Sequence, residues 1–212
     1  MRIRFKPWAR PELEASPFYI DNPQDYKEKW KTIFKNPKNP IYLELGCGKG
    51  GFISQIAIQH KEINYIAIDM VDAMLGLAKR KIEEAYKREE EEIDNVYLTR
   101  FDIERILLIF GKRDQIERIY INFCNPWPRG KHHKKRLTHT RQLEKYREFL
   151  IDGGEIYFKT DDDNLYFDSL NYLEEAGFEI IKKTEDLEAE ENFWENIQTE
   201  HEKNVYGARN KN

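Results

Sequence analysis

The sequence predicts an α/β protein with a doubly wound, mostly parallel sheet, and three observations lead to that prediction. From Pro40 onward, short apolar runs rich in β-branched and aromatic residues alternate with stretches of helical periodicity. The chain has 212 residues, of which 40% are hydrophobic, and this is enough for one well-buried domain. A glycine-rich loop, residues 46–51, follows the first apolar run and precedes a helical stretch. Alternating β and α units of this kind place helices on both faces of a parallel sheet.

The expected elements follow one another at short spacing. An N-terminal arm with four prolines leads into a predicted helix from Gln24 to Phe34. Strands are expected at Ile41–Leu45, Tyr65–Ile68, Val96–Arg100, Ile119–Phe123 and Glu155–Lys159. Helices are expected at about Phe52–His60 and Val71–Lys87, and Gly153-Gly154 is expected to form a turn before the last strand. We divide the chain into an arm and helix, residues 1–39, and a main domain, residues 40–212, within a single globular unit.

The composition excludes several classes of protein. No apolar run approaches the roughly 20 residues of a membrane-spanning helix, and the N-terminus lacks the apolar segment of a signal peptide. Cys47 and Cys124 show neither metal-ligand spacing nor a disulfide pattern. Adjacent His132 and His133 do not suggest a metal either, because neighbouring histidines rarely converge on one ion and no acid or cysteine is near them in the sequence. We therefore expect a cytoplasmic protein with no membrane partner and no metal.

Charge is unevenly distributed along the chain, although the net charge is only -4. Between Arg118 and Leu143 there is no Asp or Glu. The basic residues of this segment are Arg118, Arg129, Lys131, Lys134, Lys135, Arg136 and Arg141. Such a segment is either a solvated face or an electrostatic surface that binds phosphates, and charge alone leaves both interpretations open.

A nucleoside cofactor site is expected where the first strand ends. Ile41–Leu45 leads into Gly46-Cys-Gly-Lys-Gly-Gly51, whose glycines permit a tight turn and close approach of the backbone to a ligand. The spacing, G-x-G-x-G preceded by Glu44, matches neither the dinucleotide fingerprint nor the P-loop. Asp69 follows the second strand, where an acid can hold ribose hydroxyls, and Asp102 follows the third, where an adenine amino group can be read. The alternative is polar capping at strand ends, and Asp102 taken alone fits a helix N-cap better.

Two motifs resemble those of a known family. The glycine loop resembles the E-x-G-x-G-x-G motif of class I S-adenosylmethionine-dependent methyltransferases. After Ile119–Phe123 comes Cys124-Asn-Pro-Trp-Pro-Arg-Gly-Lys-His-His-Lys-Lys-Arg-Leu137, which resembles the N-F-x-D-P-W-P-K-x-R-H-x-K-R-R-L signature of the TrmB family, the bacterial tRNA (guanine-N7)-methyltransferases. Further similarity at Arg2–Trp8, Asn22–Trp30, Lys159–Asp161 and Thr199–Glu202 extends the resemblance over nearly the whole chain.

The resemblance implies a fold, a reaction and a set of site residues. The fold is Rossmann-like, and the reaction transfers a methyl group from S-adenosylmethionine to N7 of the variable-loop guanine of tRNA (tRNA position 46), forming 7-methylguanosine. The partner is tRNA, and family relatives include monomers and homodimers. The implied cofactor-binding residues are Glu44, Gly46, Gly48, Gly50, Asp69, Asp102 and Asn125. The implied catalytic residues are Asn125 and Asp161, and the implied substrate-binding residues are Arg129, Asp161, Thr199, Glu200, His201 and Glu202.

The chemistry of guanine N7 is consistent with these roles. N7 carries a lone pair and no proton, so it needs no general base, and catalysis depends largely on holding N7 in line with the methyl group and the sulfur. Carboxylates can accept the N1–H and amino hydrogens of guanine and stabilise the positive charge that methylation creates. The basic segment would hold phosphates without reading sequence, with Lys131, Lys134, Lys135 and Arg136 as expected tRNA backbone contacts. Trp127 suits base stacking and packing of the Pro-Trp-Pro turn equally well.

The chain departs from the family pattern at Asn125, where the family usually has aspartate. Asparagine keeps an acceptor oxygen but loses the charge, a change that can cost about 10²–10³ in rate. Three interpretations stay open. The first is an active enzyme in which Asp161 and Glu202 supply the negative potential. The second is a slow or inactive protein that still binds RNA or cofactor, and the third is a methyltransferase acting on another RNA.

Overall fold

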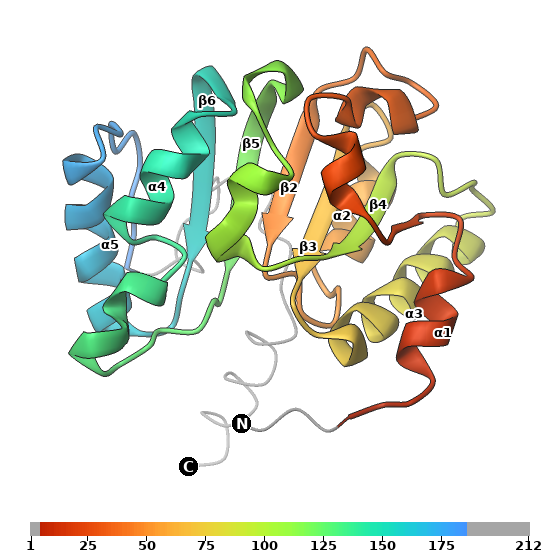
Figure 1. The fold of residues 1–212 in the computed structure, drawn as a ribbon, viewed down its shortest axis with the longest axis horizontal. Coiled ribbons are helices and arrows are strands. Elements are labelled where there is room, and N and C mark those ends of the chain that lie inside the picture. The colour runs from red at the N-terminus through yellow and green to blue at the C-terminus, as the bar shows by residue number, and fades with distance from the viewer. Residues whose placement is uncertain (1–4, 186–212) are drawn as a thin grey trace.

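The computed structural model describes residues 5–185, which contain one six-stranded parallel sheet in the order β1-β4-β3-β2-β5-β6 (Figure 1). The strands are β1 (Tyr19–Ile20), β2 (Ile41–Leu45), β3 (Asn64–Asp69), β4 (Val96–Arg100), β5 (Ile116–Asn122) and β6 (Leu150–Lys159). The α-helices are α1 (Ala9–Glu14), α2 (Ile53–Gln59), α3 (Asp72–Arg88), α4 (Thr140–Arg147) and α5 (Asp163–Glu175). Short 3₁₀ segments are η1 (Pro23–Tyr26), η2 (Trp30–Ile33), η3 (Ile103–Leu108), η4 (Lys112–Asp114) and η5 (Gly130–Lys135). The predicted doubly wound α/β class is confirmed.

Helices cover both faces of the sheet. Residues of α1, α2 and α3, such as Leu13, Ile56 and Leu75, pack in one buried layer. Residues of η3 and α4, such as Ile106 and Leu143, pack in the other. Figure 1 shows α4 and α5 beside β6 at one edge of the sheet, and α1 and α3 at the other. Both faces of the central strands are therefore buried, which explains their almost continuous apolar sequence.

The order of the strands defines a switch point beside β2. This strand pairs with β3 on one side and with β5 on the other. The chain runs from β2 through β3 to β4, then returns across the sheet to β5 and β6. Ligands of open α/β sheets bind at such a point, beyond the carboxyl ends of the strands. Because the strands are parallel, the residues that follow each strand lie along the same edge of the sheet.

The N-terminal arm forms a short helix and an edge strand that the sequence did not predict. Helix α1 packs closely on α3, where a Cβ built on Gly76 would lie 2.8 Å from the Trp8 ring. The Arg80 guanidinium stacks 3.7 Å from the Trp8 ring centre and pairs with the Glu12 carboxylate at 2.5 Å. Strand β1 then extends the sheet by pairing with β4. The arm is thus attached to the sheet through both α3 and β4.

The predicted helix from Gln24 to Phe34 is wrong. The structure has two separate 3₁₀ segments there, and Glu28 between them takes a left-handed conformation with φ 60°. The backbone amides of Glu28 and Trp30 donate to the buried Asp114 carboxylate, at 2.9 and 3.3 Å. The Trp30 indole donates to the Ile109 carbonyl at 2.7 Å. Contacts with residues about 80 positions away therefore replace the hydrogen bonds that a continuous helix would form.

Asp114→Ala is expected to destabilise the protein by about 2 kcal/mol, because removing a buried acceptor leaves its donors unsatisfied. Asp114 is 1% exposed and accepts the amides of Glu28, Trp30 and Gly111. Urea unfolding of the variant measures the loss. An unchanged unfolding midpoint would show that water replaces these hydrogen bonds without cost.

The Gly153-Gly154 pair lies inside β6 rather than in a turn before it. The register of β5 with β6 runs from Ile116 opposite Leu150 directly to Arg118 opposite Glu155. Extra residues of β6 therefore bulge out of the ladder around the two glycines. The strand begins earlier than predicted because the bulge lets pairing start on the far side of the glycines.

Candidate active site

The glycine loop and Asp69 are held together at the end of β2 and β3. The Gly48 amide donates to Asp69 Oδ2 at 3.0 Å, and the Val71 amide donates to Oδ1 at 2.9 Å. Gly50 has φ +76°, and a Cβ there would lie 2.6 Å from Ala78 of α3, so no larger residue fits. A Cβ on Gly48 would meet no described atom within 4 Å. The loop is therefore packed on α3 on one side and open on the other.

Glu44 is a buried carboxylate at the switch point. It is 2% exposed, and its Oε1 accepts a hydrogen bond from Asn122 Nδ2 at 3.3 Å. Within residues 5–185, its other oxygen, Oε2, has no hydrogen-bond partner. Buried polar atoms are nearly always paired, so an unpaired carboxylate oxygen beside the glycine loop indicates a group that awaits a ligand.

Asn122 is a candidate site residue that was not predicted from the sequence. It lies at the end of β5, is 9% exposed, and joins β5 to β2 through Glu44. The sequence does contain a sign of this role, because Asn122 is a polar residue at the end of an otherwise apolar strand, next to the expected ligand site. Its partner, however, is 78 residues away in the sequence.

Burial changes the ionisation of both acids. Removal from water raises the pKa of Glu44 to about 8, and the neighbouring Asp69 charge adds to that rise, while the Asn122 hydrogen bond lowers it. Burial also raises the pKa of Asp69, against the lowering effect of the Val71 and Gly48 amides. Burial raises the pKa of the Cys47 thiol as well, so this cysteine behaves as a neutral packing residue. The site thus favours a cationic ligand that compensates two desolvated carboxylates.

Two further residues lie at the same rim. Asp102 caps η3, its Oδ1 accepting from the Glu104 amide at 3.0 Å, so the N-cap interpretation is correct for this oxygen. Met70 follows Asp69 directly and is 56% exposed. Met70 was not predicted as a site residue, since a single methionine carries no sequence pattern. An exposed methionine beside the acid offers a flexible, polarizable contact to an aromatic ring.

The segment after β5, residues 123–130, is held in an unusual conformation. Phe123 and Trp127 both have positive φ, 50° and 43°, which non-glycine residues adopt at a cost. The Trp127 amide donates to Asn125 Oδ1 at 3.0 Å, and Asn125 itself is exposed. Trp127 is half-buried, with its ring 5.7 Å from the His132 ring and 5.1 Å from Lys135 Nζ. Strained backbone of this kind is concentrated at functional sites.

The structure corrects the role expected of Arg136. Its side chain is 1% exposed, and its guanidinium bonds to the Pro126 carbonyl and the Asp168 carboxylate. A buried guanidinium that is already paired cannot reach a phosphate. Local sequence did not reveal this burial, because the partner Asp168 comes from α5, outside the acid-free segment.

The other basic residues of the segment lie on the surface. Arg129, Lys131, Lys134 and Lys135 are all exposed on or next to η5. His133 contacts Arg136 through Nε2 at 3.2 Å. Among residues 5–185, no group of three or more His, Cys, Asp or Glu side chains is arranged to hold a metal ion.

Two neighbouring acids after β6, Asp161 and Asp162, lie in different environments. Asp162 caps α5, its Oδ1 accepting from the Leu165 amide at 2.7 Å. Asp161 precedes it, is exposed, and lies at the same sheet edge as the glycine loop. The predicted substrate residues Thr199, Glu200, His201 and Glu202 lie outside the described residues.

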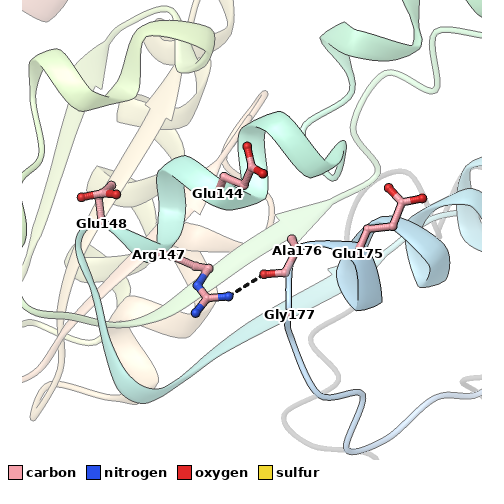
Figure 2. Close-up of a pocket in the computed structure, with 6 residues that line it drawn as sticks. All are labelled: Glu144, Arg147, Glu148, Glu175, Ala176 and Gly177. Carbon is pink, nitrogen blue, oxygen red and sulfur yellow. Dashed lines mark hydrogen bonds between the residues drawn. The ribbon is translucent and has the colours of Figure 1, made fainter.

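A pocket between the C-terminal ends of α4 and α5 is distant from these groups in the fold. Figure 2 shows its lining residues, Glu144, Arg147, Glu148, Glu175, Ala176 and Gly177. Arg147 Nη1 donates to the Ala176 carbonyl at 2.6 Å across the pocket. Because α4 leads into the start of β6, this end lies opposite the glycine loop. We assign the Arg147 contact to joining the two helices.

The fold is that of the class I S-adenosylmethionine-dependent methyltransferases. The structure is similar to that of a precorrin-6y C5,15-methyltransferase from Geobacter metallireducens GS-15, with a TM-score of 0.50 and 14% identity over 66% of this chain and 62% of that one. A family model described as "Putative methyltransferase" matches residues 38–212.

Sequence relatives narrow the class. The chain is 57% identical to a tRNA (guanine-N(7)-)-methyltransferase from Clostridium perfringens (strain SM101 / Type A), over 95% of this chain and 92% of the relative. It is also 57% identical to the enzyme of that description from Clostridium beijerinckii, over 96% of this chain and 92% of the relative. The chain belongs to the tRNA (guanine-N7)-methyltransferase family, as the motif at residues 124–137 predicted.

The residues present fit S-adenosylmethionine, the methyl donor of this family. The open side of Gly48 leaves room for a ligand. The buried Glu44 carboxylate, one oxygen of which has no hydrogen-bond partner among residues 5–185, favours a ligand with positive charge. Asp69 accepts one backbone hydrogen bond at each oxygen, and a carboxylate has about four acceptor positions in all. Asp69 can therefore accept further hydrogen bonds from hydroxyl groups.

No described helix is both long and apolar enough to cross a membrane.

Proposed function

We propose that this chain methylates N7 of a guanine in tRNA, the variable-loop guanine by family resemblance. The proposed site lies beyond the carboxyl ends of β2 and β5, where these two strands are neighbours. The observation that carries the proposal is the buried Glu44 carboxylate beside the glycine loop, one oxygen of which has no hydrogen-bond partner in the described part of the chain. The identity of the relatives supplies the tRNA substrate class. We propose a cytoplasmic site of action, where tRNA is available, and a monomer or homodimer, which sedimentation would decide.

On the cofactor side, we assign binding to Glu44, the loop glycines Gly46, Gly48 and Gly50, Asp69 and Asp102. S-adenosylmethionine supplies an electrophilic methyl group on a sulfonium centre. Glu44 would compensate its positive charge, and Asp69 would accept ribose hydroxyls. Met70 would cover one face of the adenine, which its exposed position permits. Asp102 keeps one oxygen beyond its N-cap bond for an amino group.

On the guanine side, the chain has to orient a base rather than deprotonate it, because N7 has a lone pair and no proton. Asn125 and Asp161, in the segments that follow β5 and β6, would accept guanine hydrogens and hold the ring. The negative charge of Asp161 would stabilise the cationic product. Arg129 and residues 199–202 complete the proposed substrate contacts. The rate then derives mainly from alignment of the two reactants.

The decisive experiment incubates the purified chain with labelled S-adenosylmethionine and, in separate reactions, unmodified tRNA and rRNA, followed by nuclease digestion. Labelled 7-methylguanosine is the expected product. Transfer to rRNA alone would assign a different RNA substrate. Binding of tRNA without transfer would show that the chain is a non-catalytic homologue, for which Asn125 is the supporting feature.

The double change Lys134→Gln/Lys135→Gln is expected to weaken tRNA binding and to lower the slope of log affinity against log salt by about 2, since each phosphate contact contributes about one unit. Both lysines are exposed on η5. Filter binding at several salt concentrations measures the slope. The matched control, Lys112→Gln/Arg113→Gln, removes equal charge from η4, which precedes β5 at the opposite edge of the sheet. Equal slopes for the two variants would identify η5 as an ordinary solvated face.

A further inference from the structure

We propose that Arg136 is a positioning residue for methyl transfer, fixing the backbone of the loop that carries Asn125 so that the guanine is held in line with the methyl group. The inference rests on the proposed function, which places Asn125 at the transfer centre. Arg136 itself need touch neither substrate nor cofactor, because its side chain is almost fully buried within the protein.

The contacts of Arg136 converge on this loop from behind. Its Nε donates to the Pro126 carbonyl at 2.7 Å, one residue after Asn125. Its Nη1 pairs with Asp168 Oδ2 on α5, and its Nη2 lies 3.2 Å from His133 Nε2. One planar group therefore connects the loop, α5 and η5. Arginine presents donors in a rigid fork in several directions, and lysine does not.

The loop needs such a support because its backbone is strained on both sides of Pro126. Phe123 and Trp127 occupy the left-handed region, and such conformations persist only where the surrounding structure imposes them. The Asn125 side chain is engaged by the Trp127 amide, so a shift of the Pro126 peptide would also move the Asn125 amide group. The orientation of Asn125 is thus linked to the position of the Pro126 carbonyl.

The anchor is itself well fixed. Immediately after Arg136, Leu137 packs against the glycine loop, with its Cδ1 3.8 Å from the position a Cβ would take on Gly46. Thr138 then bonds to Ser169 of α5 at 2.6 Å, and both are fully buried. Arg136 therefore lies in a short segment that contacts the cofactor loop, the substrate loop and α5. The segment therefore fixes the position of the substrate loop relative to the cofactor loop.

The test measures kcat, tRNA KM and cofactor Kd for Arg136→Met and Arg136→Lys, at a temperature where each variant is folded. We expect Arg136→Met to lower kcat by about 10-fold or more, as misplacement of reactants by about an ångström does. Cofactor Kd and tRNA KM should stay within about two-fold of the wild type. Arg136→Lys should recover part of kcat. Hydrogen exchange of a peptide covering residues 123–130 should accelerate in Arg136→Met.

The control is Arg147→Met, which removes another guanidinium that donates to a backbone carbonyl between α4 and α5 (Figure 2). Arg147 lies at the end of α4 opposite the glycine loop. The substitution should lower the melting temperature without changing kcat. An unchanged kcat in folded Arg136→Met would overturn the proposal. So would a loss confined to tRNA KM with a reduced salt slope, which would make Arg136 a phosphate contact.

Asn125→Ala separates this proposal from the proposed function. If Asn125→Ala lowers kcat and Arg136→Met does not, only the role of Arg136 fails. If neither variant changes kcat, the loop is not at the transfer centre, and the site assignment fails with it. A kcat loss in both, with cofactor Kd preserved, supports the proposal.

Discussion

Glu44→Gln is expected to weaken S-adenosylmethionine binding by about 10²–10³ while making the ligand-free protein more stable above neutral pH. Removing one partner of a buried charge interaction costs about 2 kcal/mol or more of binding free energy. Each step of about 1.4 kcal/mol corresponds to a factor of ten in affinity. Glu44 is 2% exposed, and one of its oxygens, at the switch point, has no partner among the residues that the structure describes. Glutamine keeps the size and one acceptor of the side chain, so the loss reports the charge itself.

The gain in stability follows from the pKa of Glu44, about 8 in the folded protein against an ordinary 4.5. Between these values the folded state holds a proton that the unfolded state has released. The free energy of unfolding therefore falls as pH rises through this window, and the full cost of a few kcal/mol is reached above pH 8. Glutamine does not titrate, so the variant should gain on the wild type progressively from about pH 5 to pH 8.

Melting temperatures at pH 5 and pH 8 measure this difference, with about 2–4 °C expected per kcal/mol in a domain of this size. Calorimetry in buffers of different ionisation enthalpy should show that the wild type releases a proton on binding cofactor at pH 7, and that the variant does not. The control Glu148→Gln changes an exposed carboxylate and should leave both readings unaltered. A pH-independent difference between Glu44→Gln and the wild type would mean that Glu44 ionises normally.

Asn125→Asp is expected to maintain or raise turnover, with an upper limit of about 10²–10³. The change restores the aspartate usual in the family and places a negative charge where a cationic base forms. The bond from the Trp127 amide to the Asn125 side-chain oxygen can persist, because a carboxylate oxygen accepts it equally well. Since Asn125 is exposed, ionisation there carries little desolvation cost.

Single-turnover methylation of tRNA at saturating cofactor measures this effect on the transfer step alone. The control Asn171→Asp adds the same charge on an exposed position of α5, away from its N-terminus, and should leave the rate unchanged. A clear loss of activity in Asn125→Asp would contradict the assignment of this position to the transfer centre.

Much of the framework is written locally in the chain. The bounds of β2 and β4 are those the sequence predicted, because a buried strand of a parallel sheet is a short apolar run with clear ends. The positions of Glu44 and Asp69 at one sheet edge follow from the same pattern, since the ends of parallel strands coincide. The motif around Asn125 then predicted the family.

Tertiary contacts decided the rest, because the environment of a polar group depends on residues far away in the sequence. The helix expected at residues 24–34 is broken by Asp114, 84 residues beyond Trp30. Arg136 resembles its exposed lysine neighbours in sequence but is buried against Asp168, 32 residues later. The raised pKa of Glu44 arises from burial under elements that the local pattern does not contain. Local patterns thus determined which residues gather at the site, and long-range packing determined which of them are charged, buried or free to meet a ligand.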